Sequence, residues 1–313
     1  MRAFAFDEFG VPGTVHDLPE PTPGDGQVRV RIEAASVNPA DLGMIGGAYK
    51  SFMEHRFPLV PGIDLGGTVD ALGPGVDGLA MGDHVFGAHG KRSVGEGTFA
   101  EYAIASVGTI ARRPGDVDPP FGTALSLAGV SALEMVDSAD ARPGDVVLVV
   151  GAAGGIGSVA LQLLAAARAR PIAVTRAVNH EYARSLGATE TIDYENQDVV
   201  EVVRAGHPDG IAAVFDLVGD KEAVGRFAEL VRPGGHVISM LGAADQERLA
   251  ARRVAGVNVR TQVTTDKLER LAADVAAGTL RRPQITTFPL AEAGEALAEI
   301  ARRHVRGKLV LLP

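Results

Sequence analysis

The sequence contains no cysteine, and this absence removes several kinds of chemistry. A chain without cysteine has no disulfides, no thiolate nucleophile and no cysteine ligands for zinc. It also lacks an apolar run of the ~20 residues needed to cross a bilayer, and charge appears too early for a signal peptide. The net charge is −9, which disfavours non-specific nucleic-acid binding. We therefore expect a cytoplasmic enzyme that binds neither nucleic acid nor membrane.

What the chain does have is 313 residues, enough for two domains with separate cores. Glycine, proline and short alternating runs in the first third predict a β-rich domain of barrel type. The stretch Asp118–Val136 then predicts a linking helix. The strands expected in the first third are Arg2–Phe6, Gln27–Ala35, Leu65–Leu72, His84–Gly87 and Thr98–Ile104.

From about Gly144 strands and helices alternate, which predicts a doubly wound parallel sheet covered on both faces. A last strand at Lys308–Leu312 follows two further helices, Lys267–Ala277 and Ala291–His304, so we expect it to return to the first domain. The strands expected in the sheet are Val146–Val150, Ile172–Thr175, Glu190–Ile192, Ala213–Leu217, His236–Met240 and Val257–Val263. The helices expected between them are Ser158–Ala169, Asn179–Leu186, Val199–Arg204 and Glu222–Leu230.

The most informative motif is Gly-Ala-Ala-Gly-Gly-Ile-Gly at residues 151–157, between an apolar strand and a helix. Glycines let the backbone approach phosphates, and the free N–H groups at a helix start supply donors and a positive dipole end. The motif therefore predicts binding of a dinucleotide pyrophosphate. The alternative is a tight turn with only a structural role. The expected contacts are Ala153, Gly154, Gly155, Ile156 and Gly157.

The end of the second expected strand of this sheet lacks the acid that usually holds a ribose 2′-hydroxyl. Thr175, Arg176 and Asn179 stand there, and their hydroxyl, guanidinium and amide groups can donate to a 2′-phosphate. We therefore expect NADPH rather than NADH, the alternative being that Arg176 is a surface residue at a helix start. Tyr194 follows the third strand and could stack on adenosine, donate to the same phosphate, or be a plain surface residue.

Two further turns end the fourth and fifth expected strands, at the sheet edge where ligands bind in open α/β folds. We expect Val218, Leu241 and Gly242 in these turns to contact the cofactor, although ordinary turns would have the same composition. Val263, at the end of the sixth expected strand, is a further expected contact.

Six motifs together carry a family resemblance. The sequence resembles the zinc-independent quinone oxidoreductase branch (zeta-crystallin-like NADPH:quinone reductases) of the medium-chain dehydrogenase/reductase superfamily. The motifs fall in the family's order along the full length of the chain. They are Ser36–Asp41, Pro61–Val69, Gly82–Gly87, Gly97–Tyr102, Gly151–Gly157 and Arg306–Val310.

The resemblance implies a GroES-like β-rich barrel domain at residues 1–118 and 264–313 around a Rossmann domain at residues 119–263. The active site would lie in the cleft between them, and a homodimer would form through the edge of the nucleotide domain. Zinc-dependent relatives have cysteine and histidine ligands where this chain has Asn38 and Ile63. No catalytic metal is therefore expected.

The resemblance also assigns roles to single residues. Asn38, Asp41 and Tyr49 would line the nicotinamide and substrate side, with Tyr49 donating to the substrate oxygen. Alternatively, Asn38 and Asp41 only fix their loop and Tyr49 only packs. Ser131 takes the place of a family threonine near the nicotinamide. Lys308 matches the family's terminal lysine, which either touches the cofactor or solvates the strand end.

These observations predict an NADPH-dependent, zinc-independent reductase of small-molecule quinones or α,β-unsaturated carbonyl compounds. Hydride addition to such acceptors moves charge onto an oxygen that a few donors stabilise, so no Lewis acid is needed. One alternative is an enoyl reductase of a biosynthetic pathway, whose acyl chain would pass Gly46–Ala48 and Tyr49–Phe57. Another is a non-catalytic NADPH-binding redox sensor, because the chain has no unmistakable acid/base residue.

Overall fold

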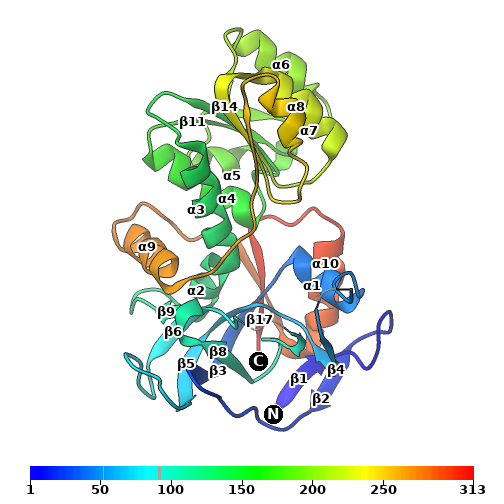
Figure 1. Ribbon diagram of the computed structural model, residues 1–313, viewed down its shortest axis with the longest axis vertical. Coiled ribbons are helices and arrows are strands. Elements are labelled where there is room, and N and C mark those ends of the chain that lie inside the picture. Colours follow the sequence, from blue (N-terminus) through cyan, green and yellow to red (C-terminus); the bar gives the residue numbers. More distant parts are fainter. Residues whose placement is uncertain (52, 91–92) are drawn as a thin grey trace. The chain divides into compact units, whose positions relative to one another are not determined.

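The computed structural model describes residues 1–51, 53–90 and 93–313, which form two compact units (Figure 1). The first unit comprises Met1–Leu127, Val263–Ala276 and Arg282–Pro313, and the second comprises Ala128–Gln262 and Ala277–Arg281. The family resemblance predicts domain boundaries after residues 118 and 263. In the structure, the first unit runs to Leu127 and resumes at Val263. No helix in the described part of the chain is long and apolar enough to span a membrane.

The first unit is built on a seven-stranded sheet with the order β16-β17-β3-β5-β6-β9, in which β8 also pairs with β3. Alternating burial shows why β3 forms, since Val28, Val30 and Ile32 face the core while Arg29 and Arg31 do not. These strands are β3 Gln27–Val37, β5 Asp64–Leu72, β6 His84–Ala88, β8 Tyr102–Ser106, β9 Ile110–Arg112, β16 Ile285–Pro289 and β17 Lys308–Leu312.

Two small sheets and four helices complete the described part of this unit. β1 pairs with β2 and β4 with β7, and buried aromatic and aliphatic side chains from the sheets fill one core. The small strands are β1 Arg2–Ala5, β2 Thr14–Asp17, β4 His55–Val60 and β7 Val94–Glu96. The helices are α1 Pro39–Ile45, α2 Pro119–Leu125, α9 Thr265–Ala276 and α10 Ala293–Ala301, with 3₁₀ turns at Val107–Thr109 and Leu290–Glu292.

The last strand of the chain lies inside the first unit, as the sequence predicts. β17 runs antiparallel to β3, with Leu309 opposite Val37 and Leu311 opposite Ala35, and parallel to β16 on its other side. This register brings Lys308, the first residue of β17, to the point where β3 ends and α1 begins.

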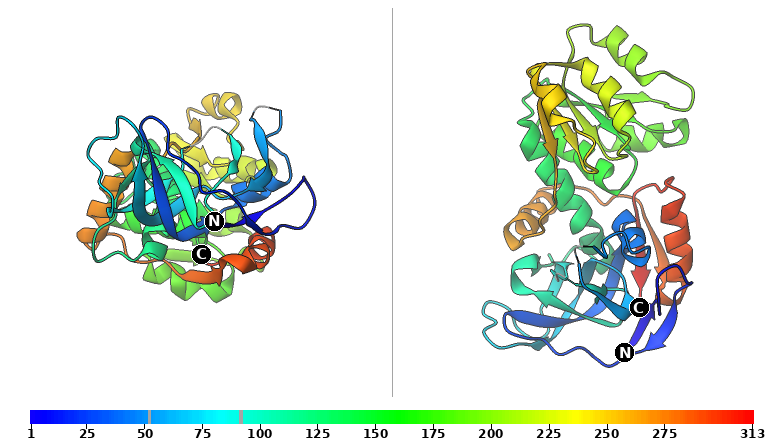
Figure 2. Two further views of the ribbon diagram at one scale, coloured as in Figure 1. Left: turned by 90° about the horizontal axis from the view of Figure 1, so that it is seen from below. Right: turned by 45° about the vertical axis from the view of Figure 1, so that its right-hand side comes forward.

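The second unit is a six-stranded sheet with the order β12-β11-β10-β13-β14-β15, in which all the neighbouring strands are parallel. This order, with a reversal between β10 and β13, is typical of dinucleotide-binding folds. Helices cover both faces of the sheet (Figure 2). The strands are β10 Val146–Val150, β11 Arg170–Val174, β12 Glu190–Ile192, β13 Ile211–Asp216, β14 Val231–Ser239 and β15 Ala255–Asn258. The helices are α3 Leu127–Ala139, α4 Gly155–Ala166, α5 His180–Ser185, α6 Val199–Gly206, α7 Lys221–Phe227 and α8 Gln246–Ala250, with 3₁₀ turns at Ala177–Asn179 and Ala228–Leu230.

Several predicted elements are wrong in their extent. The strand expected over 98–104 is Tyr102–Ser106, and the strand expected over 236–240 begins at Val231. Three further differences have a local physical reason. The helix expected over 118–136 is two helices, because Ser126 departs from helical geometry (ψ −89°). α4 begins at Gly155 rather than Ser158, because glycines 155 and 157 take helical conformations. The strand expected over 257–263 covers only Ala255–Asn258, because its pairing with β14 ends at Ser239.

Candidate functional site

The glycine-rich turn of the second unit presents bare backbone at the start of α4. Gly154 is the N-cap in an extended conformation and makes no side-chain cap. The next three amides, of Gly155, Ile156 and Gly157, have no acceptor within the helix, which makes this end electropositive. A Cβ on Gly154 would approach nothing closer than the Gly151 carbonyl oxygen at 3.5 Å. The turn therefore has open space beside free donors, which is what a pyrophosphate requires.

Gly157, at the end of the same turn, has a packing role. A Cβ on Gly157 would lie 2.5 Å from the Gly151 carbonyl oxygen and 2.6 Å from the Ala152 Cα. Ala153 beside it is buried. The helix and the strand–turn backbone therefore approach each other at Gly157 as closely as they can.

Asp216 and Ser239 join the two turns that follow β13 and β14. One Asp216 oxygen accepts the amides of Val218 and Gly219 at 3.0 and 2.9 Å, and the other accepts the Ser239 hydroxyl at 2.6 Å. The Ser239 oxygen in turn accepts the Leu241 amide at 3.2 Å. This buried pair, whose partnership the sequence did not reveal, leaves the Val218 and Leu241 side chains 44% and 61% exposed.

The four residues expected to meet a 2′-phosphate, three after β11 and Tyr194 after β12, divide into two pairs. Thr175 and Asn179 are buried, and the Asn179 amide donates to the Thr175 hydroxyl at 3.2 Å. Arg176 is partly exposed and Tyr194 is 47% exposed. Thr175 and Asn179 therefore shape the turn, while Arg176 and Tyr194 are accessible to an anion.

The remaining expected cofactor contacts of this region lie at its borders. Ser131 on α3 is buried and shares a 2.7 Å hydrogen bond with the Thr261 hydroxyl. Gly242 is exposed in the turn after β14. Val263 is partly exposed, follows no strand, and belongs to the first unit.

In the first unit, Asn38 and Asp41 form the start of α1. Asn38 is the N-cap, Pro39 follows as the first helical residue, and the Asn38 amide donates to an Asp41 oxygen at 2.7 Å. The Gly62 amide donates to the other oxygen at 3.2 Å. Burial raises the pKa of Asp41 to about 7; the nearby Asp64 charge adds to this, and the two amides and Lys308 oppose it.

Asp64 and Lys308 stand beside this helix start, and we call them, together with Ser36, Asn38 and Asp41, the buried polar cluster. Asp64 accepts hydrogen bonds from the Ser36 hydroxyl, from Asn38 Nδ2 at 3.0 Å and from the Leu127 amide at 3.0 Å. Lys308 Nζ lies 3.8 Å from the Asp64 carboxylate. Asp64 was not among the expected site residues, because a lone acid in a glycine-rich strand carries no signal.

Lys308 is buried, so the alternative that it solvates the strand end is wrong. Its ammonium donates to Asn38 Oδ1 at 2.7 Å and to the Val37 carbonyl oxygen at 3.1 Å. Burial lowers the pKa of Lys308, although Asp64 and Asp41 oppose this change.

Tyr49 follows α1 and lies against it, partly buried. A Cβ on Gly43 would stand 3.0 Å from the Tyr49 hydroxyl oxygen and 3.1 Å from Cζ, so the ring occupies the face that this glycine leaves open. Burial and the Asp41 carboxyl raise the pKa of Tyr49, which keeps its hydroxyl protonated as a donor. Phe52, within the opening expected for an acyl chain, lies outside the described residues.

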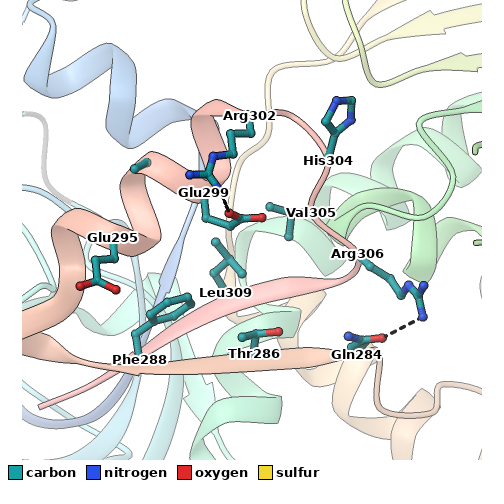
Figure 3. Close-up of a pocket in the computed structure, with 11 residues that line it drawn as sticks. Gln284, Thr286, Phe288, Glu295, Glu299, Arg302, His304, Val305, Arg306 and Leu309 are labelled. Carbon is teal, nitrogen blue, oxygen red and sulfur yellow. Dashed lines mark hydrogen bonds and ion pairs between the residues drawn. The ribbon is translucent and has the colours of Figure 1, made fainter. Parts of the chain in front are cut away.

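A pocket of about 480 Å³ lies elsewhere in the first unit, between α10 and the strands β16 and β17 (Figure 3). Among its lining residues, Arg302 forms an ion pair with Glu299 at 2.8 Å, and Arg306 donates a hydrogen bond to Gln284 at 3.4 Å. None of the expected site residues lines it. Over the described ranges, no three His, Asp or Glu side chains gather as they would around a metal ion.

Two family models match the chain. The alcohol dehydrogenase GroES-like domain matches residues 24–115, and the zinc-binding dehydrogenase model matches residues 186–311. Despite the name of the second model, the ligand positions noted above hold Asn38 and Ile63. The two matches fall on the first part of the chain and on its nucleotide-binding and C-terminal parts.

Curated relatives and a solved structure extend the match. The chain is 33% identical over 207 residues to a chloroplast envelope quinone oxidoreductase homolog of Arabidopsis thaliana, covering 63% of this chain and 62% of that one. It is 31% identical to the quinone oxidoreductase of Lama guanicoe, covering 76% and 72%. An NADPH-dependent alkenal/one oxidoreductase of Arabidopsis thaliana is 27% identical over 100% of this chain and 80% of its own length. The structure of the quinone oxidoreductase from Coxiella burnetii superposes with a TM-score of 0.90 at 28% identity, covering 100% and 99%.

The lengths matched differ between relatives. The chain spans 62% of the Arabidopsis quinone oxidoreductase homolog and 63% of a 2-methylene-furan-3-one reductase from Solanum lycopersicum. The fold, in contrast, is matched over the whole chain.

Proposed function

Because the chain belongs to the medium-chain dehydrogenase/reductase superfamily, with quinone oxidoreductases among its relatives, we propose that it is an NADPH-dependent reductase of quinones or α,β-unsaturated carbonyl compounds. The observation that carries this proposal is the bare backbone of Gly154–Gly157 at the start of α4, in a sheet of dinucleotide-binding order. A pyridine nucleotide is the cofactor of this superfamily. The alkenal/one oxidoreductase relative supports NADPH in particular.

The second unit would bind the nucleotide with groups of three kinds. Amides of the turn at Ala153–Gly157 would hold the pyrophosphate, and Arg176 and Tyr194 would donate to the 2′-phosphate because their side chains are accessible. Val218, Leu241 and Gly242 would supply apolar contacts from the turns that Asp216 and Ser239 fix. NADPH, when bound, supplies the hydride. Ser131, Val263 and Lys308 stay predictions as cofactor contacts.

In the first unit, Tyr49 would donate a hydrogen bond to the substrate oxygen on which negative charge develops. Its raised pKa suits this role, because the group stays protonated at neutral pH. Asn38 and Asp41 are buried and bonded within the start of α1, so we assign them a positioning role. No metal ligand enters this scheme, since quinones and enones need only such donors.

Stopped-flow oxidation of NADPH tests the proposal, with 9,10-phenanthrenequinone and 2-cyclohexenone as the two acceptors. Turnover of the quinone, with or without the enone, is expected. Turnover of the enone alone would restrict the proposal to α,β-unsaturated carbonyl compounds and would fit an enoyl reductase equally well. Tight NADPH binding without oxidation by either acceptor would overturn the proposal in favour of a redox sensor.

We also propose a homodimer. β15 is an edge strand of the sheet in the second unit, and its outer backbone groups offer a surface for pairing with a second copy. Sedimentation velocity would show a species of twice the chain mass. A monomer at micromolar concentration would contradict this proposal.

A further inference from the structure

The buried polar cluster joins parts of the chain that are far apart in sequence. Asn38 follows β3, Asp64 begins β5 and Lys308 begins β17, and 270 positions separate Lys308 from Asn38. The pairing of β17 with β3 places Leu309 opposite Val37, which sets the Lys308 side chain beside Asn38. The cluster therefore exists only when both ends of the first unit are in place.

Within the cluster, the Asn38 side chain is held at both ends. Its oxygen accepts from the Lys308 ammonium at 2.7 Å, and its nitrogen donates to the Asp64 carboxylate at 3.0 Å. A flipped amide would set its nitrogen against the ammonium and its oxygen against the carboxylate. The two charges therefore permit one orientation of Asn38.

The backbone of Asn38 links its oriented side chain to the start of α1. Its amide bonds Asp41, and Asp41 in turn bonds Gly62, so the helix start is tied to the loop before β5. Tyr49 follows this helix and packs over its Gly43. A change in the orientation of Asn38 would thus alter the position of Tyr49, which is assigned as the hydrogen-bond donor to the substrate oxygen.

The two charges depend on each other, because each is removed from water. The Asp64 and Lys308 side chains are 0% and 6% exposed. Removing one partner of such a pair leaves an uncompensated buried charge, whereas removing both can be nearly neutral. The other titratable group facing the pair is Asp41 on α1, which itself faces Tyr49.

We propose that Asp64 and Lys308 form a positioning pair that holds Asn38, and through it the start of α1, in the arrangement that substrate reduction requires. This inference rests on the proposed function. Neither residue needs to touch the substrate for the pair to act. Its effect is on the geometry of the loop that carries Tyr49.

The test compares Lys308→Met, Asp64→Asn and the double variant, with the exposed Lys221→Met and Asp77→Asn as matched controls. Thermal unfolding is followed from about pH 6 to about pH 9, together with the NADPH Kd and kcat for 9,10-phenanthrenequinone. Lys308→Met leaves a buried carboxyl whose pKa rises, so its Tm should fall as pH rises. Asp64→Asn leaves a buried ammonium whose pKa falls, so its Tm should fall as pH decreases.

The double variant separates positioning from stability. It should recover a Tm within a few degrees of the wild type at all pH values, because no unpaired charge remains. Its kcat should stay at least ~10-fold low, since methionine cannot hold the Asn38 oxygen. The kcat is measured at saturating NADPH, so that a weaker cofactor affinity from loss of the predicted Lys308 contact does not enter the comparison. The two controls should match the wild type.

Two results would overturn the inference. One is a double variant whose kcat returns with its Tm, which would make the pair purely structural. The other is a pair of single variants with the same pH dependence of Tm, which would show that the charges are not coupled. Failure of the wild type to oxidise NADPH would instead overturn the proposed function, and the opposite pH trends of the single variants would still report on the pair.

Discussion

Tyr49 lies over Gly43, and its ring approaches the helix this closely because residue 43 has no side chain. A Cβ at that position would stand 3.0 Å from the hydroxyl oxygen and 3.2 Å from Cε2 of the tyrosine. This contact fixes where a protonated hydroxyl is presented, just beyond a helix start that is itself tied down by Asn38 and Asp41.

Replacing Tyr49 by phenylalanine should therefore lower kcat for a quinone or enone by about 100-fold, the usual cost of losing one donor to a developing oxyanion. The ring still packs on α1, so Tm should be unchanged. Steady-state kinetics with 9,10-phenanthrenequinone provide the measurement, and fluorescence titration provides the NADPH Kd, which should be unchanged. Wild-type kcat in this variant would remove Tyr49 from the mechanism.

Gly43→Ala tests the contact from the opposite side. Alanine is favoured over glycine inside a helix by about 0.5–1 kcal/mol, so the backbone of α1 should not suffer. The tyrosine must shift by a few tenths of an ångström, which should lower kcat several-fold. In the Tyr49→Phe background the same change should have little further effect, because the two residues are coupled. Additive losses would mean that Gly43 acts on something other than the hydroxyl.

The pH dependence of stability should report Asp41. Its pKa rises from 3.8 to about 7 on folding, so the stabilisation it contributes is complete below pH 3.8 and is lost as pH rises through about 7. Over that window this group should lower the free energy of unfolding by up to about 1.4 kcal/mol per pH unit. Urea unfolding of the wild type and of Asp41→Asn measures the difference, and the variant should have the smaller slope. Asp77→Asn, an exposed change, should keep the wild-type slope.

Gly154 and Gly157 of the phosphate turn should respond in different ways to substitution by alanine. Gly154→Ala has room within the fold, so Tm should hold while the NADPH Kd rises ~10-fold, because the methyl group stands where the backbone must approach phosphate. Gly157→Ala forces a Cβ to within 2.5 Å of a carbonyl oxygen and should lower Tm by several degrees. Isothermal titration calorimetry and thermal unfolding distinguish the two. Equal effects on Tm would show that the turn has only a structural role.

Arg176→Ala should reduce the preference for NADPH over NADH. A hydrogen bond from a charged group to phosphate is worth about 1.5–3 kcal/mol, so the NADPH Kd should rise roughly 10- to 100-fold. The NADH Kd should not change, since that nucleotide has no 2′-phosphate. Titration of both nucleotides into the same variant makes the comparison. A parallel loss for both would place Arg176 elsewhere on the nucleotide.

Local patterns in the sequence were enough to predict much of this fold. Strands Val146–Val150, Glu190–Ile192 and Lys308–Leu312 have the predicted bounds, because short apolar or β-branched runs are set off by turns. The sixth strand was predicted too far along, since its extent is set by pairing with β14 rather than by its own residues. The break at Ser126 was missed because its neighbours all favour a helix.

In the candidate site, too, some features could be predicted from the sequence and others could not. The glycine turn could be predicted because four glycines fall within seven residues, directly after a strand. The bond between Asp216 and Ser239 and the contact of Lys308 with Asn38 could not, because each joins residues that only the folded sheet brings together. No pattern in the sequence indicated that Asp64 lies between the Ser36 hydroxyl, the Asn38 side-chain amide and the Lys308 ammonium.

The place of β17 has a consequence for synthesis. The ribosome delivers the strands of the second unit before Lys308–Leu312, so that unit can fold while the chain is still being made. The first unit cannot complete its sheet until β17 is made. Until then the edge of β3 that pairs with β17 is exposed, and Asp64 lacks Lys308 as its ionic partner. A nascent chain stalled just short of Lys308 should therefore be a substrate for chaperones and proteases at its first 127 residues and resistant to them over Ala128–Gln262.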